Sequence, residues 1–465
     1  MARLSRVGRA CGPRPGGALA AAAALALVLA AQAAAEAAAP GPAPPPEASP
    51  YDPLRGIDPD GRIPYARRPP DLEHPERWRY IPEGRIKPGS VFERLLVTSF
   101  LSPFFFQSSD AGFGGGLALG DIDFRSQRRR EAAALYGSYT TRNQSSFGFF
   151  WRRWIHTREL PEGGVLQEER SSLGGGVSYS RTRTRRFFGI GPDTSRSDET
   201  RYTDADFELE LNANLAYPDP GDDLVLTGGA KLELHKLSRG LGDDPDTQDV
   251  FPRLFDEAED QDLLWIVSGL RWDTRDSQRN PYRGWHVGAL AESAPIQRGG
   301  DRGGRVTLDG SKVFPLPGLF HRGGDPDEEN PPTDTLFFGL RTVLTWGDLP
   351  FFVRPRLGGP ESLRGFVRGR FTDDASWLGR AEYRLWMLER GFALTRAIRV
   401  ERVGVALFYE AGSVASGGLQ LFDARVQHSY GVSVLAGIER LLPFRADLGF
   451  SRDGLHFTAG LGLSF

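Results

Sequence analysis

Hydrophobic and polar residues alternate along most of the chain after about position 90. In the last eleven residues, Leu455–Phe465, every second side chain is hydrophobic and those between are small or polar. Successive side chains of a β-strand point to opposite faces, so this pattern predicts a strand with one apolar face. The same alternation recurs in Phe207–Tyr217, Leu226–Leu234, Leu264–Arg275, Leu336–Trp346, Val403–Gly412 and Ala446–Phe450.

A membrane barrel explains this pattern better than a soluble β-sandwich, although both alternate. The strands are close to the length of about 9–11 residues that a tilted transmembrane strand needs. The polar face is dense in Arg and Glu opposite large aliphatic and aromatic side chains, as expected of a wet lumen inside a lipid-facing wall. We therefore expect an all-β fold, a transmembrane antiparallel β-barrel of about 16 strands with an inward-folded outer loop.

The strand positions follow from counting back from the carboxyl terminus. Five strands are expected after Phe371, and about eleven more between Val91 and Trp346. The five strands after Phe371 are Trp377–Trp386, Arg402–Gly412, Ser429–Glu439, Phe444–Ser451 and Leu455–Phe465.

Six tryptophans are expected in the aromatic girdles at the membrane surfaces: Trp151, Trp154, Trp265, Trp272, Trp346 and Trp386.

The amino terminus has the features of a secretory signal peptide. Four arginines precede an apolar run, Ala18–Ala31, which small residues follow. The run is short and Ala-rich for an uncleaved membrane anchor, which is the alternative. We expect a signal peptide at 1–33, a Pro-rich linker or extended periplasmic segment at 34–90, and the barrel at 91–465. The only cysteine, Cys11, would leave with the signal.

Charge and composition argue against several other classes of protein. The formal net charge of −3 becomes −7 when 1–33 is removed with its four arginines and no acid. This balance is too mild and too evenly mixed for a nucleic-acid binder. Without a cysteine, the exported chain has no thiolate metal site or disulfide. The sequence predicts no metal, no cofactor and no catalytic residue, because the seven histidines are scattered and no nucleophile elbow is complete.

One long connection carries residues that a simple turn does not need. If the chain ends on the periplasmic side, then Pro350–Ser376 lies on the outer side, and it contains Leu363, Arg364, Gly365 and Phe366 in sequence. Gly365 permits close backbone approach. The guanidinium of Arg364 is a rigid fork of donors that suits carboxylates.

This stretch resembles the BamA/TamA-type outer-membrane assembly superfamily, also called bacterial surface antigen barrels. The resemblance implies that an Arg-Gly-Phe loop tip folds into the barrel and that Arg364 pairs with inward acids on the next two strands. Glu382 and Glu410 match those acids, and the alternation independently places both on the inner face. Leu363 stands where the family usually has Val, and Glu410 where it more often has Asp.

One further segment carries the resemblance. It joins two barrel strands in the family, and here it contains Asp273, Arg275, Asp276, Pro281 and Gly284. The terminal Phe465 is similar to the last residue of outer-membrane β-barrels in general, and this likeness implies a signal for assembly by the outer-membrane machinery. The chain departs from the family at its amino terminus, where we see no periplasmic POTRA domain, and this leaves client recruitment open.

Three functions are compatible with the sequence. The resemblance implies a barrel that helps to insert or move polypeptide, or lipid, at the bacterial outer membrane. The expected partners are outer-membrane lipid and an unfolded polypeptide client, with a first-to-last-strand seam that offers a free edge to an incoming strand. The alternatives are a passive pore or structural barrel without insertase activity, and a barrel enzyme such as a lipid hydrolase.

Overall fold

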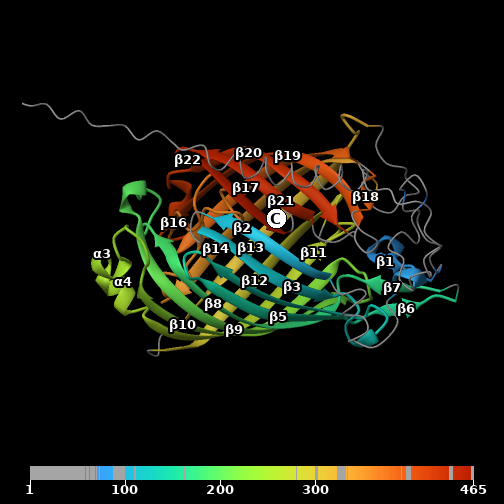
Figure 1. Cartoon of the computed structure of the whole chain (residues 1–465), viewed down its shortest axis with the longest axis horizontal. Coiled ribbons are helices and arrows are strands. Elements are labelled where there is room, and N and C mark those ends of the chain that lie inside the picture. The colour runs from blue at the N-terminus through green and yellow to red at the C-terminus, as the bar shows by residue number, and fades with distance from the viewer. Residues whose placement is uncertain are drawn as a thin grey trace, which may run out of the picture. The chain divides into compact units, whose positions relative to one another are not determined.

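The chain folds as a closed antiparallel β-barrel (Figure 1). The computed structural model describes residues 58, 62, 69, 71–72, 74–86, 100–108, 112–161, 163–278, 280–298, 302–321, 331, 333–388, 390–393, 399–438 and 443–461. Among these residues, no helix is long and apolar enough to cross a membrane. The predicted signal peptide and the terminal Phe465 lie outside the described residues.

Within the part of the chain that the structure describes, sixteen strands of at least eight residues form the barrel wall, and each pairs antiparallel with the next. The closure brings the first strand beside the last. The sixteen strands are β2 (Phe100–Ser108), β3 (Gly112–Asp121), β4 (Glu131–Thr140), β5 (Ser145–Trp154), β8 (Ser172–Phe187), β9 (Thr200–Tyr217), β10 (Leu224–Arg239), β11 (Asp260–Asp273), β12 (Gly284–Gln297), β13 (Gly303–Leu316), β14 (Asp334–Gly347), β17 (Ala375–Leu388), β19 (Arg399–Ala415), β20 (Gln427–Ile438), β21 (Pro443–Ser451) and β22 (Gly454–Leu461).

The predicted all-β barrel is confirmed, and the long strands of the described residues are close in number to the predicted value of about 16. Alternation of hydrophobic and polar residues predicts these strands because one face of each strand faces the membrane lipid and the other faces the lumen. Leu211, Leu270 and Leu340 point outward and are each more than half exposed. Glu382 and Glu410 point inward and are buried. Strands extend a few residues beyond the predicted limits, since the ladder continues after the strict alternation stops.

The two ends of the barrel differ in their connections. We call the end where β22 begins the loop end, and the end toward which β22 runs the turn end. The loop end carries the helices α3 (Thr247–Val250) and α4 (Pro252–Asp256) between β10 and β11, at the far left of Figure 1. It also carries the 3₁₀ turns η4 (Arg196–Asp198) and η5 (Gln420–Phe422). The turn end carries η3 (Phe124–Ser126) and β18 (Phe392–Ala393), which pairs with β19.

A three-stranded sheet lies at the turn end. It joins β1 (Trp78–Ile81) to a hairpin of β6 (Thr157–Glu159) and β7 (Val165–Glu168) that interrupts the connection from β5 to β8. The 3₁₀ turns η1 (Pro75–Arg77) and η2 (Glu83–Arg85) flank β1. Part of the expected linker or extended segment is therefore ordered, and its four-residue strand is too short for alternation to reveal. We call this sheet with its flanking turns the turn-end cap.

The turn-end cap is tied to three connections of the barrel. Arg77 pairs with Asp223 in the turn between β9 and β10. Arg128, between β3 and β4, donates from Nη2 to Oε2 of Glu83 over 2.8 Å. Arg170 follows β7 and donates to the backbone oxygen of Arg275, after β11, over 2.7 Å. These contacts hold residues 74–86 and the hairpin against the barrel.

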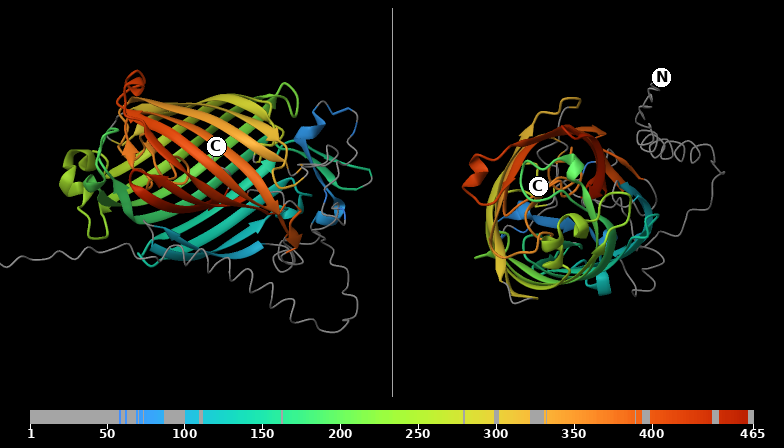
Figure 2. Two further views of the ribbon diagram at one scale, coloured as in Figure 1. Left: turned by 90° about the horizontal axis from the view of Figure 1, so that it is seen from above. Right: turned by 90° about the vertical axis from the view of Figure 1, so that its left-hand side faces the viewer.

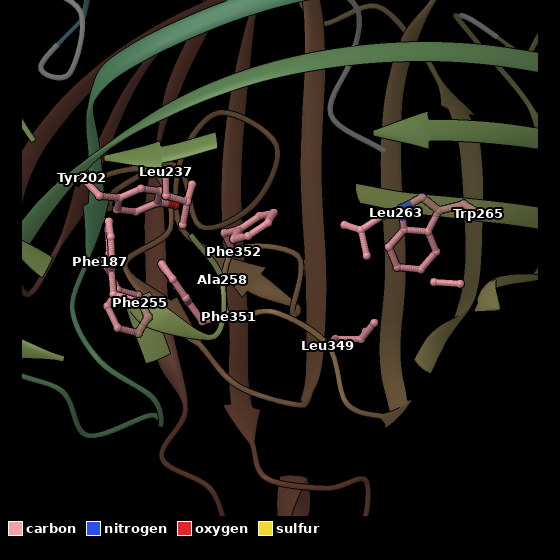
Figure 3. Packing of buried hydrophobic residues seen from close by; sticks show 11 residues of the cluster. Phe187, Tyr202, Leu237, Phe255, Ala258, Leu263, Trp265, Leu349, Phe351 and Phe352 are labelled. Carbon is pink, nitrogen blue, oxygen red and sulfur yellow. The ribbon is translucent and has the colours of Figure 1, made fainter. Parts of the chain in front are cut away.

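The connection between β14 and β17, residues 348–374, turns into the lumen, as the end-on view in Figure 2 shows. We call it the inner loop. Its first part, Leu349, Phe351 and Phe352, packs into a buried aromatic cluster on the wall formed by β8 to β12 (Figure 3). Other members of this cluster include Tyr202 and Trp265. Burying this apolar surface inside the barrel anchors the start of the loop.

Not all tryptophans lie where the girdle prediction put them. Trp272 and Trp346 face outward and are 47% and 44% exposed. Trp265 and Trp386 are instead buried in clusters with inward-facing neighbours, and Trp154 is buried as well. The prediction was wrong for these three because it used residue type without the parity of the strand, and in β11 Trp265 alternates with the outward Ile266.

Candidate functional site

The tip of the inner loop is a tight turn pressed onto the carboxyl-terminal wall of the barrel. The amide of Phe366 donates to the carbonyl of Leu363 over 2.9 Å, which closes the turn around Arg364 and Gly365. Just before and after the tip, β15 (Arg356–Leu357) and β16 (Phe371–Thr372) pair with each other and hold its two arms together. The loop therefore spans the lumen from the aromatic cluster to the opposite wall.

Arg364 is held by acids from three strands. Its Nη2 donates to Oε2 of Glu382 on β17 over 2.8 Å, and its Nε donates to Oε1 of Glu410 on β19 over 3.0 Å. Its backbone amide also donates to Oε2 of Glu410 over 2.7 Å. The third acid, Asp447 on β21, lies 3.2 Å from Nη1. Such charge-assisted hydrogen bonds are the strong ones among protein hydrogen bonds.

The guanidinium of Arg364 is almost fully enclosed, with 1% of the side chain exposed. Its Cζ lies 3.6 Å from the centre of the Phe408 ring, so the planar group stacks on an aromatic face. Burial by itself lowers the pKa of Arg364, but the carboxylates of Glu410, Glu382 and Asp447 outweigh it and raise the pKa above its ordinary value. Arg364 is therefore a fixed positive charge and not a proton carrier.

The acids that receive Arg364 are themselves held by neighbours. Glu382 accepts from Nε of Arg384 over 2.6 Å. Asp447 accepts from the Ser433 hydroxyl over 2.5 Å and from the Thr458 hydroxyl of β22 over 3.1 Å. The network thus extends from β17 to the last strand, and these neighbouring hydrogen bonds help to fix the orientation of Glu382 and Asp447.

Asp447 is a member of the site that our sequence reasoning did not assign. The alternation of Ala446–Phe450 already placed Asp447 on the inner face, and that parity was the signal available. The resemblance pointed only to acids on the two strands after the loop. Residues two strands further along come close only because β17, β19, β20 and β21 lie side by side in the wall.

Glycine is required at the tip by close packing of two backbones. A Cβ on Gly365 would lie 2.4 Å from the carbonyl oxygen of Phe450, and one on Gly449 would lie 2.6 Å from the carbonyl oxygen of Arg364. The amide of Gly365 donates to the Ser429 hydroxyl over 2.6 Å, and its carbonyl accepts from Ser451 over 2.6 Å. The loop tip and β21 therefore approach to a distance that larger residues prevent.

Leu363 and Phe366 provide the apolar part of the attachment. Both are fully buried and pack in a cluster of the inner loop and the inner wall. Phe366 meets Phe371 edge to face, with 5.2 Å between the ring centres. The cluster is completed by Leu357, Leu378 and Val414. These contacts exclude water from one side of the ion-pair network, which strengthens it.

A second arginine of the inner loop joins three connections at the loop end. Nε of Arg370 donates to Oδ2 of Asp453, in the turn between β21 and β22, over 2.6 Å. Its Nη1 and Nη2 donate to the hydroxyl and the carbonyl of Thr194, in the connection between β8 and β9, over 2.9 and 2.8 Å. Phe188 lies against the guanidinium, with its ring centre 4.7 Å from Cζ. We call this arrangement the Arg370 clasp.

The predicted segment between β11 and β12 forms a compact turn at the turn end. Arg275 donates from Nε and Nη2 to the two oxygens of Asp273, each over 2.9 Å. Oδ1 of Asp276 accepts from the amides of Ser277 and Tyr282, each over 3.0 Å. Pro281 is buried in the same turn. Gly284 has φ +101°, and a Cβ there would lie 2.6 Å from the backbone of Arg275.

This segment is distant in the fold from the loop tip, so the predicted site residues form two groups. Leu363, Arg364, Gly365, Phe366, Glu382 and Glu410 come together in the lumen. The group with Asp273 and Gly284 instead contacts Arg170, which follows β7 of the turn-end cap, through the backbone carbonyls of Asp273 and Arg275. The two groups therefore brace the barrel at different levels.

A polar cavity of about 680 Å³ remains in the lumen beside the inner loop. Both acidic and basic side chains line it, among them Glu208, Glu233, Arg305 and Arg341. The inner loop contributes Arg356 and Glu361 to the same cavity. In the described residues there is no group of three or more histidine, cysteine or acidic side chains placed to hold a metal ion.

Comparison with known proteins identifies the family. The model of the Omp85 superfamily domain matches residues 89–465. No curated protein sequence matches the chain. Among solved structures, CdiB from Escherichia coli is similar with a TM-score of 0.50 and 12% identity, over 77% of this chain and 60% of that one.

Two further solved structures are similar. BamA from Haemophilus ducreyi lacking POTRA domains 1–3 has 12% identity and a TM-score of 0.46, over 77% of this chain and 68% of that one. CdiB from Acinetobacter baumannii has 12% identity and a TM-score of 0.44, over 83% of this chain and 65% of that one. The chain thus spans about two thirds or less of each solved chain. It belongs to the Omp85 superfamily and is a bacterial outer-membrane β-barrel.

Proposed function

We propose that this barrel helps to insert or translocate unfolded polypeptide at the outer membrane. The observation that carries the proposal is the attachment of the inner loop to the carboxyl-terminal wall through Arg364. That network reaches Thr458 on β22, which borders the closure between the first and last strands. A loop fixed in this way supports the β22 side of the seam from within the barrel.

The role of the seam follows from the physics of strand edges. When two edge strands separate, each presents unpaired amides and carbonyls that a third strand is able to pair with. An incoming client strand would add to β22 while the loop tip keeps β17 to β21 in register. Family membership supports insertion or translocation at this general level.

The test is to lock the seam and measure client insertion. We would replace Phe457 of β22 and, one at a time, residues of β2 by cysteine in a chain with Cys11→Ser, and reconstitute the oxidised barrel in vesicles. The client is an unfolded eight-stranded outer-membrane barrel, and the readout is its conversion to a protease-resistant, heat-modifiable form. Insertion should fall to the level of empty vesicles on oxidation and return with reductant.

A matched control uses a pair that is not at the seam. Phe450 and Leu455 lie directly opposite each other on β21 and β22, so cysteines there fix a contact that has no need to open. Oxidation of this pair should leave insertion unchanged. If the seam crosslinks fully and insertion continues at its normal rate, or if the unmodified barrel inserts nothing, the protein is a static pore or scaffold.

A further inference from the structure

The loop between β19 and β20, residues 416–426, folds outward onto the lipid-facing surface of the barrel. Leu421 is 8% exposed because it packs on Ala375 and Ala415, with Leu344 and Trp377 beside it. Leu344 of β14 is paired with Ala375 of β17, and both alternate with inward residues. The surface that Leu421 covers is therefore the outer face of the wall and not the lumen.

The views along and across the barrel agree with this placement. In the end-on view of Figure 2, the orange-red stretch that contains η5 lies outside the ring of strands. The hydroxyl of Ser413, near the end of β19, donates to the carbonyl of Arg425 over 2.8 Å. A Cβ on Gly418 would lie 3.1 Å from the side chain of Leu344, so the loop backbone runs close to the wall.

The geometry of η5 points two large apolar side chains away from the protein. The amide of Phe422 donates to the carbonyl of Leu419 over 3.3 Å, which closes a 3₁₀ turn. In such a turn, side chains three positions apart eclipse each other. Leu419 and Phe422 therefore share one side, while Leu421 points to the wall. They are 81% and 88% exposed, the highest fractions among the large hydrophobic side chains described.

The level of the loop along the barrel matches a membrane surface. Trp346, Tyr409 and Tyr430 lie on the outward faces of the strands near the loop end and are 44–57% exposed, as in an aromatic girdle. Leu344 and Trp377, on which the loop rests, belong to the same outward faces. The polar residues of the loop, Asp423 and Arg425, remain exposed beside the apolar pair. This combination is typical of chain that lies in a lipid interface.

We propose that residues 416–426 form a wedge that inserts Leu419 and Phe422 among the acyl chains of the outer leaflet. Exposure of two neighbouring large apolar side chains to water is unfavourable, whereas acyl chains accept them. Because the wedge projects sideways beside β14, β17 and β19, it displaces lipid there and disturbs the packing of the leaflet locally. This inference goes beyond the proposed insertion activity and does not depend on it.

The experiment places a fluorescent label on the apolar side of η5. Single cysteines at Phe422 and, separately, Leu419 in the full-length Cys11→Ser chain carry a bimane label, and each barrel is held alone in a phosphatidylcholine nanodisc. Quenching is measured with acyl chains brominated near the headgroup and with iodide in the water. Val250→Cys on α3, an apolar residue 48% exposed on another loop, is the matched control.

We expect brominated lipid to quench the labels at positions 422 and 419 at least about twofold more than it quenches the label at 250. Iodide should show the reverse order. Heat-modifiability on a gel checks that each labelled barrel is folded, and the two positions give independent readings. If iodide quenches the labels at 422 and 419 while brominated lipid does not, the loop projects into water and the proposal is wrong. Shielding from both quenchers would assign the loop to contact with protein and would equally overturn it.

Discussion

The guanidinium of Arg370 lies 2.6 Å from the carboxylate of Asp453, so the inner loop is tied to the last hairpin of the barrel as well as to the wall. Arg364 and Arg370 lie six positions apart in the inner loop, and they contact the barrel at different heights along its axis. Arg364 reaches acids within the lumen, and Arg370 reaches two connections at the loop end. The seam-side strands β21 and β22 are therefore held at two heights by one connection.

Removing the side chain of Arg364 should strongly destabilise the barrel. Arg364→Ala leaves Glu382, Glu410 and Asp447 buried without their common partner, and breaking a buried pair of this kind costs about 3–5 kcal/mol. The measurement is the temperature at which the folded barrel loses its fast gel mobility. The control is Arg239→Ala, which removes an exposed arginine paired with Asp249 and should leave that temperature nearly unchanged. If both variants melt at the same temperature, the pairing of Arg364 with the three acids does not stabilise the barrel.

The three acids should not contribute equally. Glu410 receives both the backbone amide and Nε of Arg364, whereas Asp447 receives one contact at 3.2 Å. Glu410→Gln is therefore expected to destabilise the barrel more than Asp447→Asn. A double-mutant cycle with Arg364→Ala measures each coupling, for which contacts in one network give about 0.5–3 kcal/mol. A larger coupling to Asp447 than to Glu410 would contradict the geometry described above.

Gly365→Ala tests the close approach of the loop tip to β21. The added methyl would meet the carbonyl of Phe450 at 2.4 Å, and the backbone must shift to relieve the clash. Overpacking of this kind typically costs about 1–3 kcal/mol. The matched control is Gly437→Ala on β20, where nothing lies within 4 Å of the new Cβ. Unfolding of the two variants, followed by gel mobility against temperature, should differ clearly, and similar curves would argue against close packing at the tip.

The Arg370 clasp should control local opening at the loop end. In Arg370→Gln, we expect faster amide hydrogen exchange in residues 188–199 and 451–454, since both connections lose a charged partner. Exchange in β17 should be unaffected. Arg354→Gln, which removes a pair with Asp374 at 3.0 Å in the same loop, is the control and should leave 451–454 unchanged. Uniformly faster exchange throughout the barrel would mean that Arg370 supports global and not local stability.

The turn-end cap should loosen in acid. The hydrogen bond from Arg128, followed by that from the amide of Gly164, holds the pKa of Glu83 below its ordinary value. A lowered pKa contributes stability that is present above the ordinary Glu pKa of about 4.3 and is lost as the pH falls through the lowered value. Limited proteolysis of residues 74–86 should therefore accelerate in that acid range.

The matched variant for this effect is Glu83→Gln, which cannot ionise. Its cap should be cleaved faster than the unmodified cap at neutral pH, and the rates of the two proteins should converge in acid. A cleavage rate of the unmodified protein that does not change with pH would show that Glu83 has no part in holding the cap.

The sequence by itself determined the barrel, its approximate strand number and the direction in which most side chains point. Alternation does this because a strand between lipid and lumen has two unlike faces, and each residue reports its own face without reference to distant residues. The alternation placed Glu382 and Glu410 on the inner face, and the family resemblance predicted that Arg364 pairs with them. The alternation also showed that Asp447 and Trp265 face inward, although the prediction of aromatic girdles used residue type alone and so misplaced Trp265.

Only the tertiary structure decided which of these residues meet. Asp447 joins Arg364 because β21 lies beside β20 and β19 in a closed wall, and Arg370 meets Thr194 because two connections 176 positions apart share one end of the barrel. Likewise, β1 finds its partner in a hairpin more than 80 positions away, and the loop that carries Phe422 bends outward onto β14 and β17. Contacts between segments so far apart depend on curvature and closure, which the local pattern of a strand does not contain.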